Sequence, residues 1–81
     1  MMNPSKIQQL IETQIPNSRA IVQSPDGIHF EAIVISSEFE NKTKVQQQQL
    51  VYKAVYSYIQ EGSLHALSLK TYTPELWEKN K

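Results

Sequence analysis

The sequence predicts an α+β fold in which helices pack on a three-stranded mixed sheet, with the element order α-β-β-α-β-α. Two segments carry apolar residues at helical spacing, and three shorter runs have the composition of strands. Proline or glycine stands at most of the junctions between these segments. The chain has 81 residues, the length of one domain, and we expect a single domain over residues 1–81.

The first helix is predicted to begin at Asn3 and Pro4. An asparagine side chain can accept a hydrogen bond from a free amide at the N-cap, and a proline at the first helical position has no amide hydrogen to leave unpaired. Pro16 ends the helical pattern. The apolar residues between these points recur on one face and are Ile7, Leu10, Ile11 and Ile15.

Two strands are predicted over residues 19–24 and 28–36, joined as an antiparallel hairpin. The intervening Pro25-Asp26-Gly27 is a turn sequence, because proline presets its own φ and glycine accepts a positive φ. The second run becomes apolar on both faces toward its end, which indicates a central strand. In the polar connection that follows, Phe39 is the one residue expected to anchor the chain.

A second amphipathic helix is predicted over residues 43–60, ended by Gly62 in a left-handed conformation. The short glutamine run 46–49 at its start is interpreted as solvent-exposed helix surface. Its packed side is expected to carry Val51, Tyr52, Ala54, Val55, Tyr58 and Ile59.

The last strand is predicted to start at Leu64 and to run parallel to the second strand, because a strand-helix-strand connection favours a right-handed crossover. Thr73 is expected to cap a short terminal helix that has Pro74 in its first turn. The aromatic side chains of Tyr72 and Trp77 are expected to close the small core.

The composition excludes several classes of function. Eight basic and eight acidic residues give no net charge, so there is no overall basic field for non-specific binding of nucleic acid. The chain has no cysteine, hence no disulfide and no thiolate. No apolar run reaches the length of a signal peptide or a membrane span, and we expect a cytoplasmic protein. No nucleophile motif, paired carboxylates or phosphate-binding glycine loop is present, which argues against an enzyme.

His29 and His65 are the candidate metal ligands. Both stand at the start of predicted strands, either at one rim of the sheet or at opposite ends. For His65, a ligand and a partly buried structural histidine are both consistent with the pattern. Two histidines without cysteine do not close a zinc or iron–sulfur site, so a second molecule would have to supply thiolates.

Nucleic-acid binding is the alternative function. Lys42 and Lys44 lead into the second helix, where they can reach phosphate groups, and Lys53 follows in the same helix. However, Glu38 and Glu40 precede them, and a Gly-x-x-Gly loop that clamps a nucleotide backbone is absent. The charges therefore favour a mixed solvated surface.

Three segments resemble the BolA family. They are residues 24–39 with Ser-Pro-Asp-Gly-Ile-His-Phe-Glu, the Val51-Tyr52 pair, and residues 65–77 with His-Ala-Leu-Ser-Leu-Lys-Thr-Tyr-Thr-Pro-x-x-Trp. The glutamines before Val51 are more similar to the YrbA/IbaG branch than to the founding branch, which carries Arg-His-Arg there. The resemblance implies a class II KH-like fold and a role in stress response.

The resemblance also implies the partner and the cofactor. Members bind monothiol glutaredoxins and share a glutathione-supported 2Fe–2S cluster, for which His65 matches the family's ligand. The second ligand falls near Asp26 by alignment, but His29 is the better donor for iron. Partner contacts are expected around Gly27, His65, Lys70 and Thr73. The chain alone is expected to be a monomer without cofactor that forms a heterodimer with its partner. The transcriptional roles of the family imply the alternative, with Lys42, Lys44 and Lys53 contacting nucleic acid.

Overall fold

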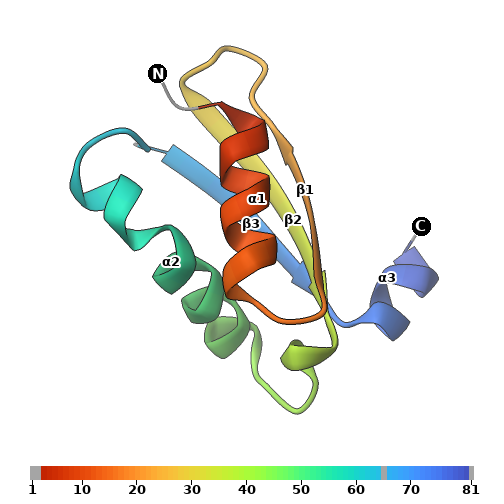
Figure 1. The fold of residues 1–81 in the computed structure, drawn as a ribbon. Helices are drawn as coiled ribbons and strands as arrows, with labels where there is room; N and C mark the ends of the chain where they lie inside the picture. The colour runs from red at the N-terminus through yellow and green to blue at the C-terminus, as the bar shows by residue number, and fades with distance from the viewer. Residues whose placement is uncertain (1–2, 65, 81) are drawn as a thin grey trace.

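A computed structural model describes residues 3–64 and 66–80 of the chain. The predicted order of elements is confirmed, with one short 3-10 helix, η1, added after the second strand (Figure 1). The elements are α1 (Pro4–Gln14), β1 (Ser18–Gln23), β2 (His29–Ser36), η1 (Ser37–Phe39), α2 (Lys44–Gln60), β3 (Ala66–Tyr72) and α3 (Pro74–Asn80).

The predicted helix starts are confirmed by hydrogen bonds. The Asn3 side chain accepts from the Lys6 amide at 2.9 Å, with proline next to it in the first turn of α1. At the start of α2, Thr43 and Gln46 each accept a hydrogen bond from the other's backbone amide, which is a complete capping box. The Thr73 hydroxyl accepts from the Leu76 amide at 3.3 Å in α3.

The sheet has the strand order β1-β2-β3. β1 pairs antiparallel with β2, so that Ile21 lies opposite Ile33. β2 pairs parallel with β3, and His29 lies opposite Ala66 at the start of both strands. The predictions of a central second strand and a parallel last strand are therefore confirmed, with α2 as the crossover.

Helices α1 and α2 cover one face of the sheet, and α3 lies beyond the ends of β2 and β3 (Figure 1). Phe39 of η1 is completely buried, as expected of the anchor of this connection. Burial of these aliphatic and aromatic side chains is the main source of stability in a domain of this size. The core cluster consists of Ile7, Ile11, Ile15, Ala20, Phe30, Val34, Phe39, Val51, Val55 and Leu64.

The packed side of α2 differs from the prediction. Gln47 is buried, although the glutamine run was expected to be solvent-exposed, whereas Tyr52 and Ile59 are 39% and 38% exposed. The reason is that β3 is an edge strand, so α2 has a helical neighbour, α1, on one flank only. The apolar side chains of Tyr52 and Ile59, on the flank away from α1, therefore stay partly exposed.

Tyr72 and Trp77 form an aromatic pair at the end of the sheet. Their ring centroids are 5.4 Å apart with the planes tilted by 52°. Both are half-buried, neither belongs to the core cluster, and α3 has no buried residue. The expectation that they close the core is wrong, because α3 lies beyond the sheet rather than on the face that α1 and α2 cover.

Candidate metal and partner site

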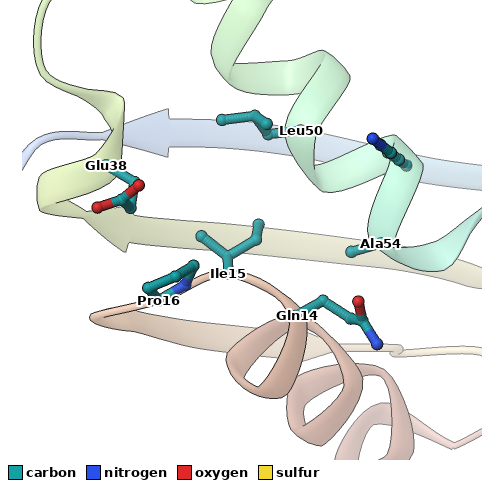
Figure 2. A pocket seen from close by; sticks show the side chains of 7 residues that line it. Gln14, Ile15, Pro16, Glu38, Leu50 and Ala54 are labelled. Carbon is teal, nitrogen blue, oxygen red and sulfur yellow. The ribbon is translucent and has the colours of Figure 1, made fainter.

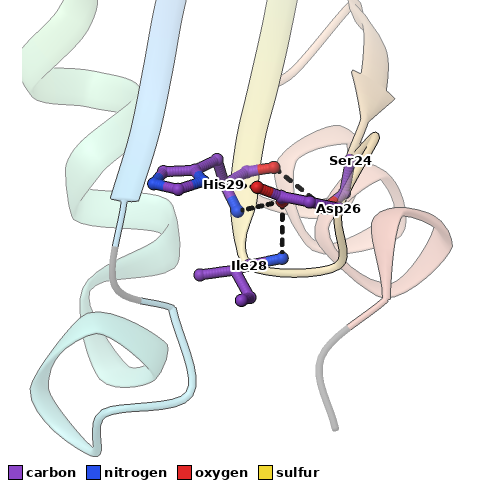
Figure 3. A network of polar contacts seen from close by, with 4 residues as sticks. All are labelled: Ser24, Asp26, Ile28 and His29. Atoms are coloured by element: carbon purple, nitrogen blue, oxygen red, sulfur yellow. Dashed lines mark hydrogen bonds and ion pairs between the residues drawn. The ribbon is translucent and has the colours of Figure 1, made fainter.

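The turn between β1 and β2 is built around the carboxylate of Asp26 (Figure 3). Its Oδ1 accepts hydrogen bonds from the backbone amides of Ile28 at 2.9 Å and His29 at 2.7 Å. Gly27 has a φ of 75°, which confirms the predicted positive φ of this turn. The Ser24 hydroxyl donates to the His29 carbonyl at 2.9 Å. These contacts fix the backbone that carries His29 into β2.

His29 and Asp26 also interact through their side chains. Nδ1 of His29 lies 2.6 Å from Oδ2 of Asp26, and the two side chains are 70% and 48% exposed. The hydrogen bond from the His29 side chain, followed by those from the His29 and Ile28 amides, holds the pKa of Asp26 well below its ordinary value. Asp26 is therefore an ionised carboxylate at neutral pH.

His29 borders an open hollow of about 530 Å³ at the edge of the sheet where β2 and β3 begin. His65, the principal predicted ligand, lies outside the described residues. The next residue, Ala66, is the register partner of His29, so the two strands that follow the histidines begin at the same rim. The hollow is lined by Pro25, Asp26, His29, Phe30, Glu31, Ala66, Leu67 and Ser68.

The residues predicted to contact a partner are spread along the sheet. Gly27 lies in the turn next to His29. Lys70 follows Ala66 by four positions, or ~13 Å of strand, and Thr73 follows by seven positions, or ~23 Å. A partner that covers the rim at His29 therefore reaches Thr73 only if it spans the length of β3.

Of the three lysines of the alternative function, Lys42 and Lys53 line one open hollow, whereas Lys44 is not among its lining residues. Lys42 donates to the Glu38 carbonyl at 2.9 Å. Lys44 donates to the Thr71 carbonyl, and its ammonium lies 4.8 Å from the ring centroid of Tyr72. Thus two of the three ammonium groups are already engaged within the chain.

Lys53 faces away from Lys44, on the side of α2 that is turned to α1. It lines a hollow of about 310 Å³ between the end of α1 and α2 (Figure 2). Glu38 lies in the same hollow, so the local charge is balanced. The other lining residues are Gln14, Ile15, Pro16, Leu50 and Ala54.

The sequence identified Asp26 and His29 as candidates but missed the relation between them. An aspartate three residues before a strand start can accept hydrogen bonds from the amides of the second and third residues after it. The same spacing brings the side chain of a histidine at that third position beside the second carboxylate oxygen. The Asp-x-x-His spacing was the available signal. In the part of the chain that the structure describes, no group of three or more His, Cys, Asp or Glu side chains has the arrangement of a metal site.

None of the helices within 3–64 and 66–80 has the length and hydropathy needed to cross a membrane.

Known proteins similar to this chain agree with this architecture. The family model described as BolA-like protein matches residues 3–76. The acid stress protein IbaG of Escherichia coli K12 is 32% identical over 80 residues, which are 99% of this chain and 94% of that protein.

Two solved structures extend the comparison. A bolA protein homologue from Coxiella burnetii is 46% identical, with a TM-score of 0.85 over 96% of this chain and 99% of the other. Yeast Fra2 is 34% identical, with a TM-score of 0.75 over 96% of this chain and 86% of the other. Since the match extends through nearly all elements, from α1 into α3, the chain belongs to the BolA family.

Proposed function

We propose that this chain is a non-catalytic partner of a monothiol glutaredoxin, with which it shares a glutathione-supported 2Fe–2S cluster. Its role is in the trafficking of clusters or in the sensing of iron and redox state. The proposal follows from membership of the BolA family and from the partner and cofactor that the sequence resemblance implies. The observation that carries it is the exposed imidazole of His29 at the rim where β2 and β3 begin.

The donor chemistry at this rim fits the cluster. Imidazole nitrogen replaces thiolate on one iron in Rieske centres, where it raises the reduction potential. His29 offers such a nitrogen, and His65 is the second nitrogen donor of the proposal. The thiolates come from glutaredoxin and glutathione, because the chain has no cysteine.

The hollow beside His29 supports a docking role for the same rim. Its accessible lining combines the exposed Pro25 and the half-buried Leu67 with the exposed His29, whereas Phe30 behind them is buried in the core. An apolar surface next to a polar donor is typical of contacts that exclude water around a bound group. The partner is therefore proposed to cover this hollow together with His29.

The test is anaerobic cluster reconstitution with a monothiol glutaredoxin and glutathione, followed by visible circular dichroism and native mass spectrometry. We expect the wild-type chain to form a heterodimer whose cluster spectrum differs from that of glutaredoxin alone. The variants His65→Ala and His29→Ala should each lose this difference, and Gln49→Ala, an exposed change on α2, should retain it. A wild-type spectrum identical to that of glutaredoxin alone, with no heterodimer, would overturn the proposal.

A further inference from the structure

Both carboxylate oxygens of Asp26 have hydrogen-bond partners within the chain. Oδ1 accepts the Ile28 and His29 amides, and Oδ2 is in contact with the imidazole of His29 (Figure 3). Direct ligation of a metal by Asp26 would disrupt these contacts and put a hard oxygen ligand on iron that prefers thiolate and imidazole. We therefore do not assign Asp26 as a metal ligand.

The contact with Asp26 determines which nitrogen of His29 carries the proton. A neutral imidazole has one N–H donor and one acceptor nitrogen. A carboxylate only accepts, so the nitrogen that lies 2.6 Å from Oδ2, Nδ1, must be the donor. The lone pair of the neutral ring is then on Nε2, at the other end of a side chain that is 70% exposed.

The turn also holds the ring in place. In Figure 3 the imidazole extends from β2 toward the start of β3, on the side where both strands border the open hollow. Both the backbone amide and the side chain of His29 are bonded to the same carboxylate, so backbone and ring are oriented together. Metal-binding histidines are commonly oriented in this way by a carboxylate on the second nitrogen.

We propose that Asp26 is a positioning residue, which keeps the proton of His29 on Nδ1 and directs the Nε2 lone pair to the rim where β2 and β3 begin. The identity of the group that Nε2 binds rests on the proposed function. The tautomer and the orientation of the ring are properties of this chain alone, and they are tested without a partner.

The decisive variant is Asp26→Asn. Its amide has the shape of the carboxylate, and its oxygen can still accept the two backbone amides. Its NH2 group then faces Nδ1, which must become the acceptor, so the proton moves to Nε2 and occupies the exposed nitrogen. A purely structural contribution of Asp26 to the turn would not invert the tautomer. Glu31→Gln removes an exposed carboxylate from the same hollow and is the matched control.

The experiment is long-range proton–nitrogen NMR of the histidines in the free chain at about pH 8, where an ordinary imidazole is neutral. We expect the Nδ1–H form of His29 in the wild type and in Glu31→Gln, and the Nε2–H form in Asp26→Asn. Amide spectra that match the wild type outside the turn would show that the variant is folded. An Nε2–H form in the wild type, or an unchanged tautomer in Asp26→Asn, overturns the proposal.

A second measurement separates this inference from the proposed function. In cluster reconstitution with glutaredoxin and glutathione, the heterodimer with Asp26→Asn should bind the cluster with about 10-fold lower affinity than the wild-type heterodimer. This is the lower end of the loss in metal affinity that follows when an orienting partner is removed. If the wild type has the expected tautomer but forms no cluster complex, the proposed function fails while the positioning role stands. If the complex forms equally well with Asp26→Asn, the positioning role fails.

Discussion

The hydroxyl of Thr71 donates a 2.7 Å hydrogen bond to Oε1 of Gln47, and both side chains are buried. The amide nitrogen of Gln47 donates in turn to the carbonyls of Phe39 and Lys42, at 3.0 and 3.1 Å. One glutamine thus links the start of α2, the connection after η1 and the end of β3. Its polar groups are satisfied, which makes burial of this side chain tolerable.

Gln47→Ala should lower the free energy of unfolding by about 2 kcal/mol, because it leaves buried polar groups without partners. Urea denaturation followed by far-UV circular dichroism measures the change. Gln49→Ala is the matched control, since this glutamine of the same run is exposed, and its effect should stay within about 0.5 kcal/mol. Equal effects of the two variants would contradict the bracing role of Gln47.

Gln47 also shows where prediction from the sequence ends. Local signals were sufficient for the three helices and three strands that were predicted, since the caps at Asn3 and Thr73 and the turn at Gly27 depend on neighbouring residues only, whereas η1 was not predicted. The central place of β2 followed from its apolar residues on both faces, and the parallel direction of β3 followed from the general handedness of crossovers. The burial of Gln47 depends on Thr71, 24 positions away, which no local pattern reveals.

The candidate site, too, was only partly predictable from the sequence. Residue chemistry was enough to select His29, and alignment with the family selected Asp26. The contact between Nδ1 and Oδ2 needed coordinates, as did the register of His29 with Ala66. The spread of the expected partner-binding residues also needed coordinates, since Thr73 lies at the opposite end of β3 from Ala66.

Gly27→Ala should lower the free energy of unfolding by about 1 kcal/mol, because an alanine is strained at positive φ. The added Cβ would have no atom within 4 Å, so the effect isolates the backbone conformation from steric contact. Gly27→Asn should cost less, since asparagine tolerates this region better. Urea denaturation of both variants is the measurement, and an alanine variant as stable as the wild type would show that the turn does not need the positive φ.

The pKa of the Asp26 carboxyl should lie well below its ordinary value in the wild type and rise in His29→Phe. The side-chain hydrogen bond from His29 is the largest cause of the depression, whereas the two backbone amides remain in the variant. Asp26 is the only aspartate in the sequence, so a carbon-detected NMR titration of aspartate carboxyl groups reports on it alone.

The sign of the accompanying change in stability follows from the same depression. The folded state releases this proton more readily than the unfolded state, so the Asp26 contacts stabilise the fold fully above the ordinary pKa of aspartate. Their contribution is lost as the pH falls through the lower folded pKa. A wild-type titration at the ordinary value, or no change in His29→Phe, would contradict the hydrogen-bonded turn.

Lys44→Met should lower the free energy of unfolding by about 1 kcal/mol, because Lys44 donates to the Thr71 carbonyl and its ammonium lies over the Tyr72 ring. Lys53→Met, on the opposite flank of α2, should change it by less than about 0.5 kcal/mol.

The two variants also separate the proposed adaptor from a nucleic-acid-binding protein. An adaptor uses Lys44 to hold α2 to the end of β3, so urea denaturation should detect the substitution, and binding of a single-stranded oligonucleotide across a salt series should not depend on either lysine. A nucleic-acid-binding protein would instead show affinity that falls steeply with salt and falls further in Lys53→Met without loss of stability. That second result would favour the nucleic-acid alternative, whereas a Lys44→Met variant as stable as the wild type would overturn the assignment of Lys44 as a structural lysine.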